Sequence, residues 1–261
     1  MPVYEQANRP FRVETALGPD VLLLDGFAGE EGVSTPFTFT LDLVSEDDAI
    51  DAGSLLRTPV TVTVQLADDQ ERIIHGLVSR FVQLGQSESG DLTSYRAEVV
   101  PWLWFLSLSS ECKIFRNMSV LEIAEDVFLA QGYSDFELKW CVKSYPQREY
   151  CVQYRETHLN FVSRLLEEEG IFYFFKHSES NHVLTLADHN SAVEPCPGQA
   201  TARVAPQEGA WQEEDVVTAL EREHAAFLGK VTLRDYDHLQ PSLKLESSVS
   251  GDGKEEMYDY P

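Results

Sequence analysis

Alternating apolar and polar residues in the first hundred positions constrain the fold of this chain more than any other feature. Residues 37–43 read FTFTLDL and residues 60–66 read VTVTVQL. Successive side chains of a β-strand point to opposite faces of the sheet, so this pattern buries one face of each strand. Residues 72–84 and 93–100 continue the pattern, and strands in such succession predict a barrel or sandwich. The residues that we expect in its core are Phe37, Phe39, Leu41, Leu43, Val60, Val62 and Val64.

Helical spacing begins after Pro101. Ser119 and Glu122 form a predicted capping box, because the hydroxyl and the carboxylate each satisfy a free backbone N–H at the start of a helix. Apolar residues then recur at helical spacing, and Gly132 tolerates the left-handed conformation that ends a helix. The sequence therefore predicts one helix between Ser119 and Gly132.

A second helix is predicted from Thr157 to Gly170. Residues 150–156 in front of it alternate as a strand, and residues 171–175 and 183–186 behind it flank a polar turn. The middle of the chain therefore combines two helices with a β-hairpin.

Strand patterns return near the carboxyl end, at residues 216–222 and 230–236, after a segment rich in Pro and Gly. Residues 247–256 are polar and are interpreted as a loop. The complete pattern is that of a β-rich α+β protein.

The charge balance excludes two classes of partner. The net charge is −24, from 20 Lys and Arg against 44 Asp and Glu. Nucleic acids and anionic lipids both require cations on the protein, so neither is an expected partner. Stable membrane insertion is not expected either, because no run approaches the roughly 20 apolar residues of a membrane span. The start of the chain lacks the pattern of a secretory signal, which predicts that it is first located in the cytoplasm.

A metal site is the first chemical hypothesis that the residues raise. His177, His182, Asp188 and His189 surround one predicted hairpin, and imidazoles with a carboxylate can hold zinc. The histidines lack the i, i+4 spacing of a helical metal motif, and the favoured interpretation is a polar rim of the hairpin. The four cysteines, Cys112, Cys141, Cys151 and Cys196, match no zinc pattern and are expected to be reduced.

Nucleophilic chemistry is the second hypothesis. Cys151 and His158 could form a thiolate pair, but no third group that would orient them is evident. Residues 85–90, GQSESG, lack the second Gly of a nucleophile elbow and are interpreted as a hairpin loop. No catalytic, cofactor-binding or metal-binding residue is therefore predicted, and the chain is not expected to be an enzyme.

Three carboxylates, Glu167, Glu168 and Glu169, close the second predicted helix. Negative charges at this end oppose the helix dipole when nothing neutralises them. They are either solvated or meet a cation, such as an Arg on a neighbouring subunit.

Ordered motifs give the chain a resemblance to a known family. They are residues 17–23 (LGPDVLL), 75–78 (HGLV), 112–117 (CKIFRN), 148–156 (REYCVQYRE), 160–165 (NFVSRL), 168–173 (EEGIFY) and 258–261 (YDYP). In this order they resemble the VgrG family, the spike proteins of type VI secretion systems. The resemblance extends from one end of the chain to the other.

The resemblance implies a structural role. VgrG proteins are trimeric spikes whose amino-terminal part is similar to the baseplate hub of contractile-tailed phages, with two barrel-like tube domains in each chain. Three chains give a ring with pseudo-six-fold symmetry, which caps the hexameric tube protein Hcp. Family members continue beyond the hub into an OB-type barrel and a β-helical needle, and this chain stops at Pro261, before the needle.

The resemblance also divides the chain into expected parts. Residues 1–105 correspond to a first β-barrel tube domain, residues 106–200 to an α+β middle segment with two helices and a hairpin, and residues 201–261 to the start of a second, truncated tube domain. The implied partners are two further copies in the full-length protein, Hcp, baseplate components and effectors. The implied location is the cytoplasm before the apparatus fires, and afterwards the medium or a target cell.

Two alternatives to a spike hub remain open at this stage. One is a secreted hydrolase or toxin built on Cys151 and His158 or on the hairpin histidines. The other is an adaptor that loads effectors without joining the tip. Metal content, hydrolase activity and binding to the tube protein would distinguish them.

Overall fold

The computed structural model describes residues 4–66, 70–86, 91–195, 201–205, 216–226 and 228–260. The chain forms two units, residues 1–200 and residues 201–261. The elements of the first unit are β1 (Phe11–Glu14), β2 (Leu23–Gly32), β3 (Thr35–Ser45), the 3-10 helix η1 (Ala52–Ser54), β4 (Pro59–Gln65), β5 (Glu71–Gln86), β6 (Thr93–Val100), the 3-10 helix η3 (Trp102–Leu108), β7 (Ser110–Phe115), α1 (Val120–Ala130), β8 (Phe136–Trp140), β9 (Cys151–Thr157), α2 (His158–Glu169), β10 (Phe172–His177), β11 (His182–Ala187) and the 3-10 helix η4 (Asn190–Ala192).

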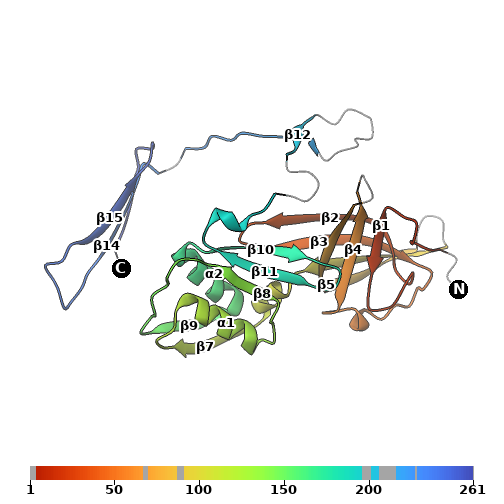
Figure 1. Ribbon diagram of the computed structural model, residues 1–261, viewed down its shortest axis with the longest axis horizontal. Helices are drawn as coiled ribbons and strands as arrows, with labels where there is room; N and C mark the ends of the chain where they lie inside the picture. The colour runs from red at the N-terminus through yellow and green to blue at the C-terminus, as the bar shows by residue number, and fades with distance from the viewer. Residues whose placement is uncertain are drawn as a thin grey trace. The chain divides into compact units, whose positions relative to one another are not determined.

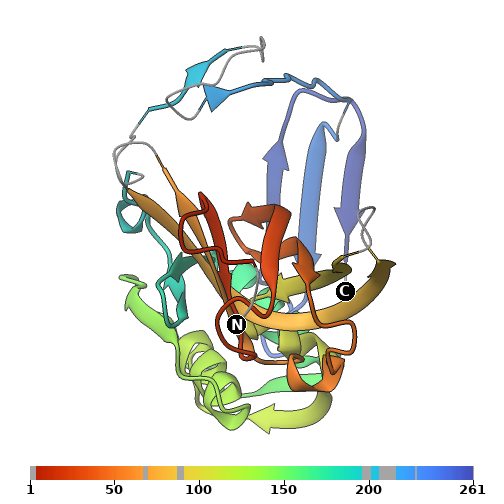
Figure 2. The ribbon, with the colours of Figure 1, turned by 90° about the vertical axis from the view of Figure 1, so that its right-hand side faces the viewer.

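Six antiparallel strands form a curled sheet in the order β1-β4-β5-β6-β3-β2. The curl, seen in Figure 2, brings the two end strands near each other, with the rings of Phe11 and Phe27 6.0 Å apart. All seven residues predicted for the core are buried. The barrel-like, β-rich fold class predicted from the sequence is therefore confirmed.

The second face of β4 is also covered, which alternation alone did not predict. Thr61 and Thr63 are buried together with the valines on either side of them. The Thr61 hydroxyl donates a hydrogen bond of 2.9 Å to the carbonyl oxygen of Glu179, in the turn between β10 and β11. The turn of the hairpin therefore contacts the outer face of β4 at Thr61.

Gly76 of β5 lies where the core leaves no room for a Cβ atom. A Cβ at this position would fall 2.5 Å from Val99 Cγ1 and 3.0 Å from the carbonyl oxygen of Val100. Gly76→Ala is therefore expected to lower the free energy of unfolding by about 1–3 kcal/mol, the usual cost of overpacking a core. Gly26→Ala is the matched control, because nothing lies within 4 Å of its Cβ position. Urea denaturation of the two variants measures the difference, and equal stabilities would contradict the prediction.

Both helices begin and end where the sequence predicts. Ser119 and Glu122 make the reciprocal contacts of a capping box at the start of α1. The hydroxyl of Thr157 accepts the N–H of Asn160 at the start of α2, and Gly170 ends α2 in the left-handed conformation, with φ 68°. The buried faces of the two helices meet in one hydrophobic cluster with β10 and β11.

The predicted hairpin is formed by the antiparallel strands β10 and β11, and it extends from the helices to β5 (Figure 1). Two strands of this region were not predicted. β8 adds to β11 in parallel, and β7 pairs with β9 in a separate antiparallel ribbon.

The described residues of the second unit form two small sheets. Its elements are β12 (Arg203–Val204), β13 (Val216–Val217), β14 (Lys230–Asp235), β15 (Leu245–Ser250) and β16 (Glu256–Asp259). β12 pairs with β13, and β14 is central between antiparallel β15 and parallel β16. The prediction of a loop at residues 247–256 was partly wrong, because residues 245–250 form β15. Nearly all of this strand is exposed, so no buried face imposes an apolar alternation on it.

Candidate functional site

A cluster of three histidines joins the curled sheet to the hairpin. His75 lies on β5, His177 on β10 and His182 on β11. The Nδ1 atoms of His75 and His182 lie 2.9 Å apart, and the backbone N–H of His75 donates to His177 Nδ1 at 3.1 Å. His75 and His182 are 4% and 3% exposed. The joint between the two parts of this unit therefore contains a buried, polar contact.

The hydrogen-bond partners determine where the protons of the buried pair lie. His182 Nε2 accepts the backbone N–H of Trp102 at 2.8 Å. A neutral imidazole carries one proton, so the proton of His182 lies on Nδ1 and is donated to His75 Nδ1. The proton of His75 then lies on its Nε2 atom. Both rings are thus assigned as neutral, with opposite tautomers.

The surroundings favour these neutral forms. Burial, together with His75 and His177, lowers the pKa of His182 to about 3. Burial and the neighbouring His177 also lower the pKa of His75, and Asp135 opposes them. The hydrogen bond with His177 lowers the pKa of Glu31, whose Oε1 lies 3.2 Å from His177 Nε2. The negative charge of the cluster therefore lies on Glu31, and the buried pair of histidines carries no positive charge.

The candidate metal ligands on this hairpin do not converge. Both ring nitrogens of His182 are committed to hydrogen bonds, and a metal on Nδ1 would leave the ring with no proton at all. His189 is exposed and accepts the backbone N–H of Ser191 at the start of η4. Across the residues that the structure describes, no group of His, Cys, Asp or Glu side chains is arranged to hold a metal ion. The interpretation as a polar rim fits His189, whereas His182 is buried.

Asp188 has a structural environment of its own. Its carboxylate accepts hydrogen bonds from the backbone N–H groups of Val142 and Lys143 and from the hydroxyl of Tyr145. Burial alone would raise the pKa of Asp188, and these three hydrogen bonds lower it. Asp188 therefore fastens the segment after β8 to the end of β11.

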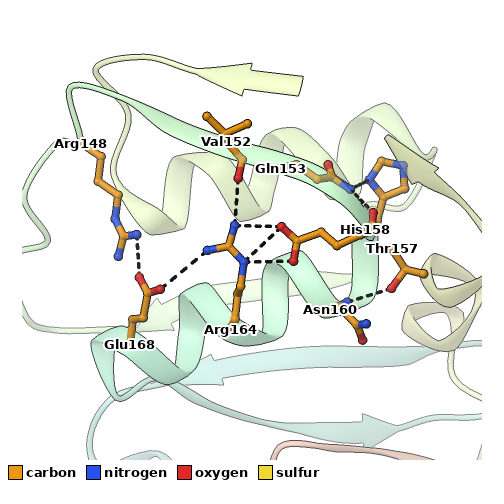
Figure 3. Close-up of polar contacts among 9 residues, drawn as sticks. Arg148, Val152, Gln153, Thr157, His158, Asn160, Arg164 and Glu168 are labelled. Atoms are coloured by element: carbon orange, nitrogen blue, oxygen red, sulfur yellow. Dashed lines mark hydrogen bonds and ion pairs between the residues drawn. The ribbon is translucent and has the colours of Figure 1, made fainter. Parts of the chain in front are cut away.

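Cys151 begins β9 and His158 begins α2 after the other end of that strand, so they do not form the pair considered from the sequence. His158 Nδ1 faces Gln153 Nε2 at 3.2 Å, as Figure 3 shows, and its backbone N–H donates to Ser109. Cys151 is buried opposite Phe115. Cys112, Cys141 and Cys151 are free thiols, whereas Cys196 and residues 87–90 of the rejected nucleophile elbow lie outside the described residues.

The carboxylates at the end of α2 meet arginines of the same chain. Arg148 donates to Glu168 at 2.7 Å and to Glu169 at 3.0 Å. Arg164 binds both carboxylate oxygens of Glu156, and it also donates to a backbone carbonyl of β9 at 2.9 Å (Figure 3). These cations neutralise the acidic end of the helix, where positive charge also complements the helix dipole. The network fixes α2 against β9 and the loop in front of it.

The β7–β9 ribbon presents an apolar outer face. Ile114, Tyr150 and Tyr154 are between 52% and 64% exposed. Arg116 lies over the ring of Tyr150 at 5.8 Å, and Arg155 lies over the ring of Tyr154 at 5.3 Å. Aromatic and Arg side chains of this kind are enriched in protein–protein interfaces. This face is therefore a candidate interaction surface.

A second candidate surface lies on the sheet of β14, β15 and β16. Val249, Val231 and Met257 are directly paired across the three strands and therefore share one face. Val249 and Met257 are 73% and 52% exposed, and Leu233, two residues along β14 on the same face, is 55% exposed. A continuous apolar row of this kind is typical of a surface that binds another protein.

The histidine cluster was not identified from the sequence, although His75 lies in one of the family motifs. The available signal was the pair His177 and His182, which directly oppose each other in the hairpin register. No local pattern shows that β5 meets this hairpin. None of the helices described is long and apolar enough to cross a membrane.

Residues 30–261 match the phage tail baseplate hub (GPD) family. The chain is 37% identical, over 98% of its length, to the type VI secretion system spike proteins VgrG1b and VgrG1a of Pseudomonas aeruginosa. The chain belongs to the VgrG family. The resemblance inferred from the motifs is therefore confirmed. The chain spans only 35% of VgrG1b and 40% of VgrG1a.

Solved structures support the fold of a VgrG hub. An E. coli component of the type VI secretion system, described as structurally similar to the T4 bacteriophage tail proteins gp27 and gp5, aligns with a TM-score of 0.60 at 29% identity. That alignment covers 70% of this chain and 50% of the other. A chain of the Francisella PdpA–VgrG complex aligns with a TM-score of 0.59 over 97% of this chain and 42% of that one, at 9% identity, and supports the fold alone.

Proposed function

We propose that this chain is the hub part of a type VI secretion spike. In the full-length protein it assembles as a homotrimer, caps the hexameric Hcp tube, contacts baseplate components and carries effectors. The observation that carries the proposal is the 37% identity to spike proteins over nearly the whole chain. The three parts expected from the sequence, residues 1–105, 106–200 and 201–261, are proposed to be the first tube domain, the middle segment and the beginning of the second tube domain.

The exposed row on β14, β15 and β16 supports assembly from several copies. Val249, Met257 and Leu233 would be left in water in an isolated chain. A ring of identical subunits buries such a face against a neighbour. We therefore place a contact between copies at this row. It is the surface that trimerisation of the full-length protein covers.

We propose that the chain performs no catalysis. Three observations support this proposal: His158 is engaged by Gln153, Asp188 binds the backbone, and the hairpin histidines hold the sheet to the hairpin. The proposed location follows from the hub role. The protein is cytoplasmic before firing and is then secreted or injected into a target cell, and nucleic acid and membrane are not among its partners.

Alanine at Cys151 or His158 is expected to leave export intact, because the proposed role depends on assembly and not on a nucleophile. The test uses the full-length protein in a cell with a working secretion apparatus and measures the spike and Hcp in the medium. Near-UV circular dichroism of each purified variant shows whether the fold survives. The full-length protein is also expected to be a trimer that co-purifies with Hcp.

Two outcomes would contradict the proposal. One is a folded full-length protein that neither trimerises nor binds Hcp, which would favour the adaptor. The other is a folded, exported Cys151→Ala variant that has lost a hydrolytic or toxic activity, which would favour an enzyme.

A further inference from the structure

The histidine cluster leaves no place for the protons that acid would add to its buried pair. The Nδ1–H of His182 already occupies the 2.9 Å gap to His75 Nδ1, and a second proton there would set two N–H groups against each other. The other nitrogen of His182 faces the N–H of Trp102 at 2.8 Å, so a proton on Nε2 meets the same repulsion. Both rings are buried, and water does not compensate a charge on them.

His177 differs from its two neighbours because an acceptor lies near each of its nitrogens, although Nδ1 also faces the backbone N–H of His75 at 3.1 Å. Nδ1 lies 3.0 Å from the carbonyl oxygen of His75, and Nε2 lies 3.2 Å from Glu31. A proton added to His177 turns Nδ1 from an acceptor of the His75 N–H into a donor to the His75 carbonyl. The new charge lies in a ring whose centroid is 6.4 Å from that of His182, and it disfavours a second charge there.

The surrounding charges do not offset the cost of protonating the buried pair. The charged groups that face the cluster are Glu14, Glu31, Arg72, Asp135 and Glu179. Glu31 is shared between His177 and Arg72. Asp135 favours protonated His75, but burial and His177 outweigh it and lower the pKa of His75. Glu14 and Glu179 line a cavity of about 240 Å³ beside His75.

We propose that His75, His177 and His182 form a latch that holds the β10–β11 hairpin on the curled sheet at neutral pH and releases it in acid. Protons enter the buried pair of His75 and His182 only when the hairpin leaves β5, because the separated rings are then hydrated and no longer face N–H donors. This regulation goes beyond the hub assembly proposed above and does not depend on it.

The sign of the effect follows from linkage between protonation and opening. An exposed histidine binds its proton near a pH of about 6.5. His182 in the closed latch does not do so until its pKa of about 3. The contribution of the neutral histidines to the stability of the closed state is therefore fully present above the ordinary histidine pKa. It decreases as the pH falls below that value. For each histidine that the closed latch keeps neutral, the equilibrium constant for opening rises by up to tenfold when the pH falls by one unit. This factor equals about 1.4 kcal/mol.

Hydrogen exchange of the unmodified chain tests release directly. Exchange is compared at about pH 7.5 and about pH 5 after correction for the intrinsic rates. The backbone N–H groups of His75 and Trp102 bond to the rings of His177 and His182, and their protection is expected to fall at least about tenfold at the lower pH. Helix α1, whose backbone hydrogen bonds lie within the helix, is expected to keep its protection. Equal corrected protection of the His75 and Trp102 N–H groups at the two pH values would overturn the proposal.

A conservative variant separates the latch from other acid effects. In His75→Asn the side-chain oxygen replaces Nδ1 as acceptor for His182, and one titrating ring is removed. The pH dependence of opening is then expected to weaken by up to tenfold per pH unit. The exposed His189 provides the matched control, because His189→Asn removes a histidine outside the cluster and is expected to keep the full pH dependence. An unchanged pH dependence in folded His75→Asn would contradict the latch.

Discussion

Leu165→Asp is expected to abolish the cooperative fold of the first unit. Leu165 lies on α2, is 0% exposed and packs within the cluster that joins both helices to the hairpin. Removing a buried Leu side chain alone costs about 2–5 kcal/mol, and an unpaired carboxylate adds the cost of burying a charge. A domain is stable by only about 5–15 kcal/mol, so little or nothing remains. Thermal melting followed by near-UV circular dichroism measures the effect.

Leu129→Asp is the matched control for this prediction. Leu129 lies on α1 in the same unit and is 53% exposed. Because no core contact is lost there, its free energy of unfolding is expected to change by only about 0.5 kcal/mol. A soluble Leu165→Asp variant with a wild-type melting transition would show that α2 packs through another face.

Local patterns sufficed where an element is determined by its own residues. Ser119 and Glu122 satisfy each other's backbone donors, and Gly170 takes up a conformation that few other residues tolerate, so both helix ends could be predicted. The core face of β3 could be predicted because the other face is partly in water. Strands β8 and β15 lack this contrast. β8 is half-buried along most of its length and β15 is exposed along most of it.

The polar sites were predictable only in part, because their members are distant in the sequence. His75 is separated from His177 and His182 by 102 and 107 residues, and nothing near any of them indicates this contact. For the acidic end of α2, the sequence indicated either solvent or a cation. The structure supplies two cations, Arg148 and Arg164, from the same chain. Arg164 lies on α2 itself, four residues before Glu168, and is a local signal, whereas the loop that carries Arg148 could not be predicted locally.

Phe37→Ala is expected to weaken the barrel core and the hairpin joint together. Phe37 is 1% exposed, and its ring centroid lies 5.1 Å from that of Phe175 and 4.9 Å from that of His177, both on β10. Truncating a buried Phe to Ala costs about 3–5 kcal/mol, because the apolar contacts are lost and a cavity remains. Urea denaturation measures the loss, and hydrogen exchange shows whether residues 172–187 lose protection with the sheet.

Phe11→Ala separates this role from the general cost of removing a ring. Phe11 lies on the end strand β1 and is 42% exposed, with its nearest aromatic neighbour, Phe27, in the same sheet. Its loss is expected to cost about 1 kcal/mol and to leave the hairpin protected. Phe37 is different because its ring belongs to the barrel core while it touches the side chains of β10. If Phe37→Ala lowered stability no more than Phe11→Ala, or left the hairpin fully protected, the sheet and the hairpin would be held together by the polar contacts alone.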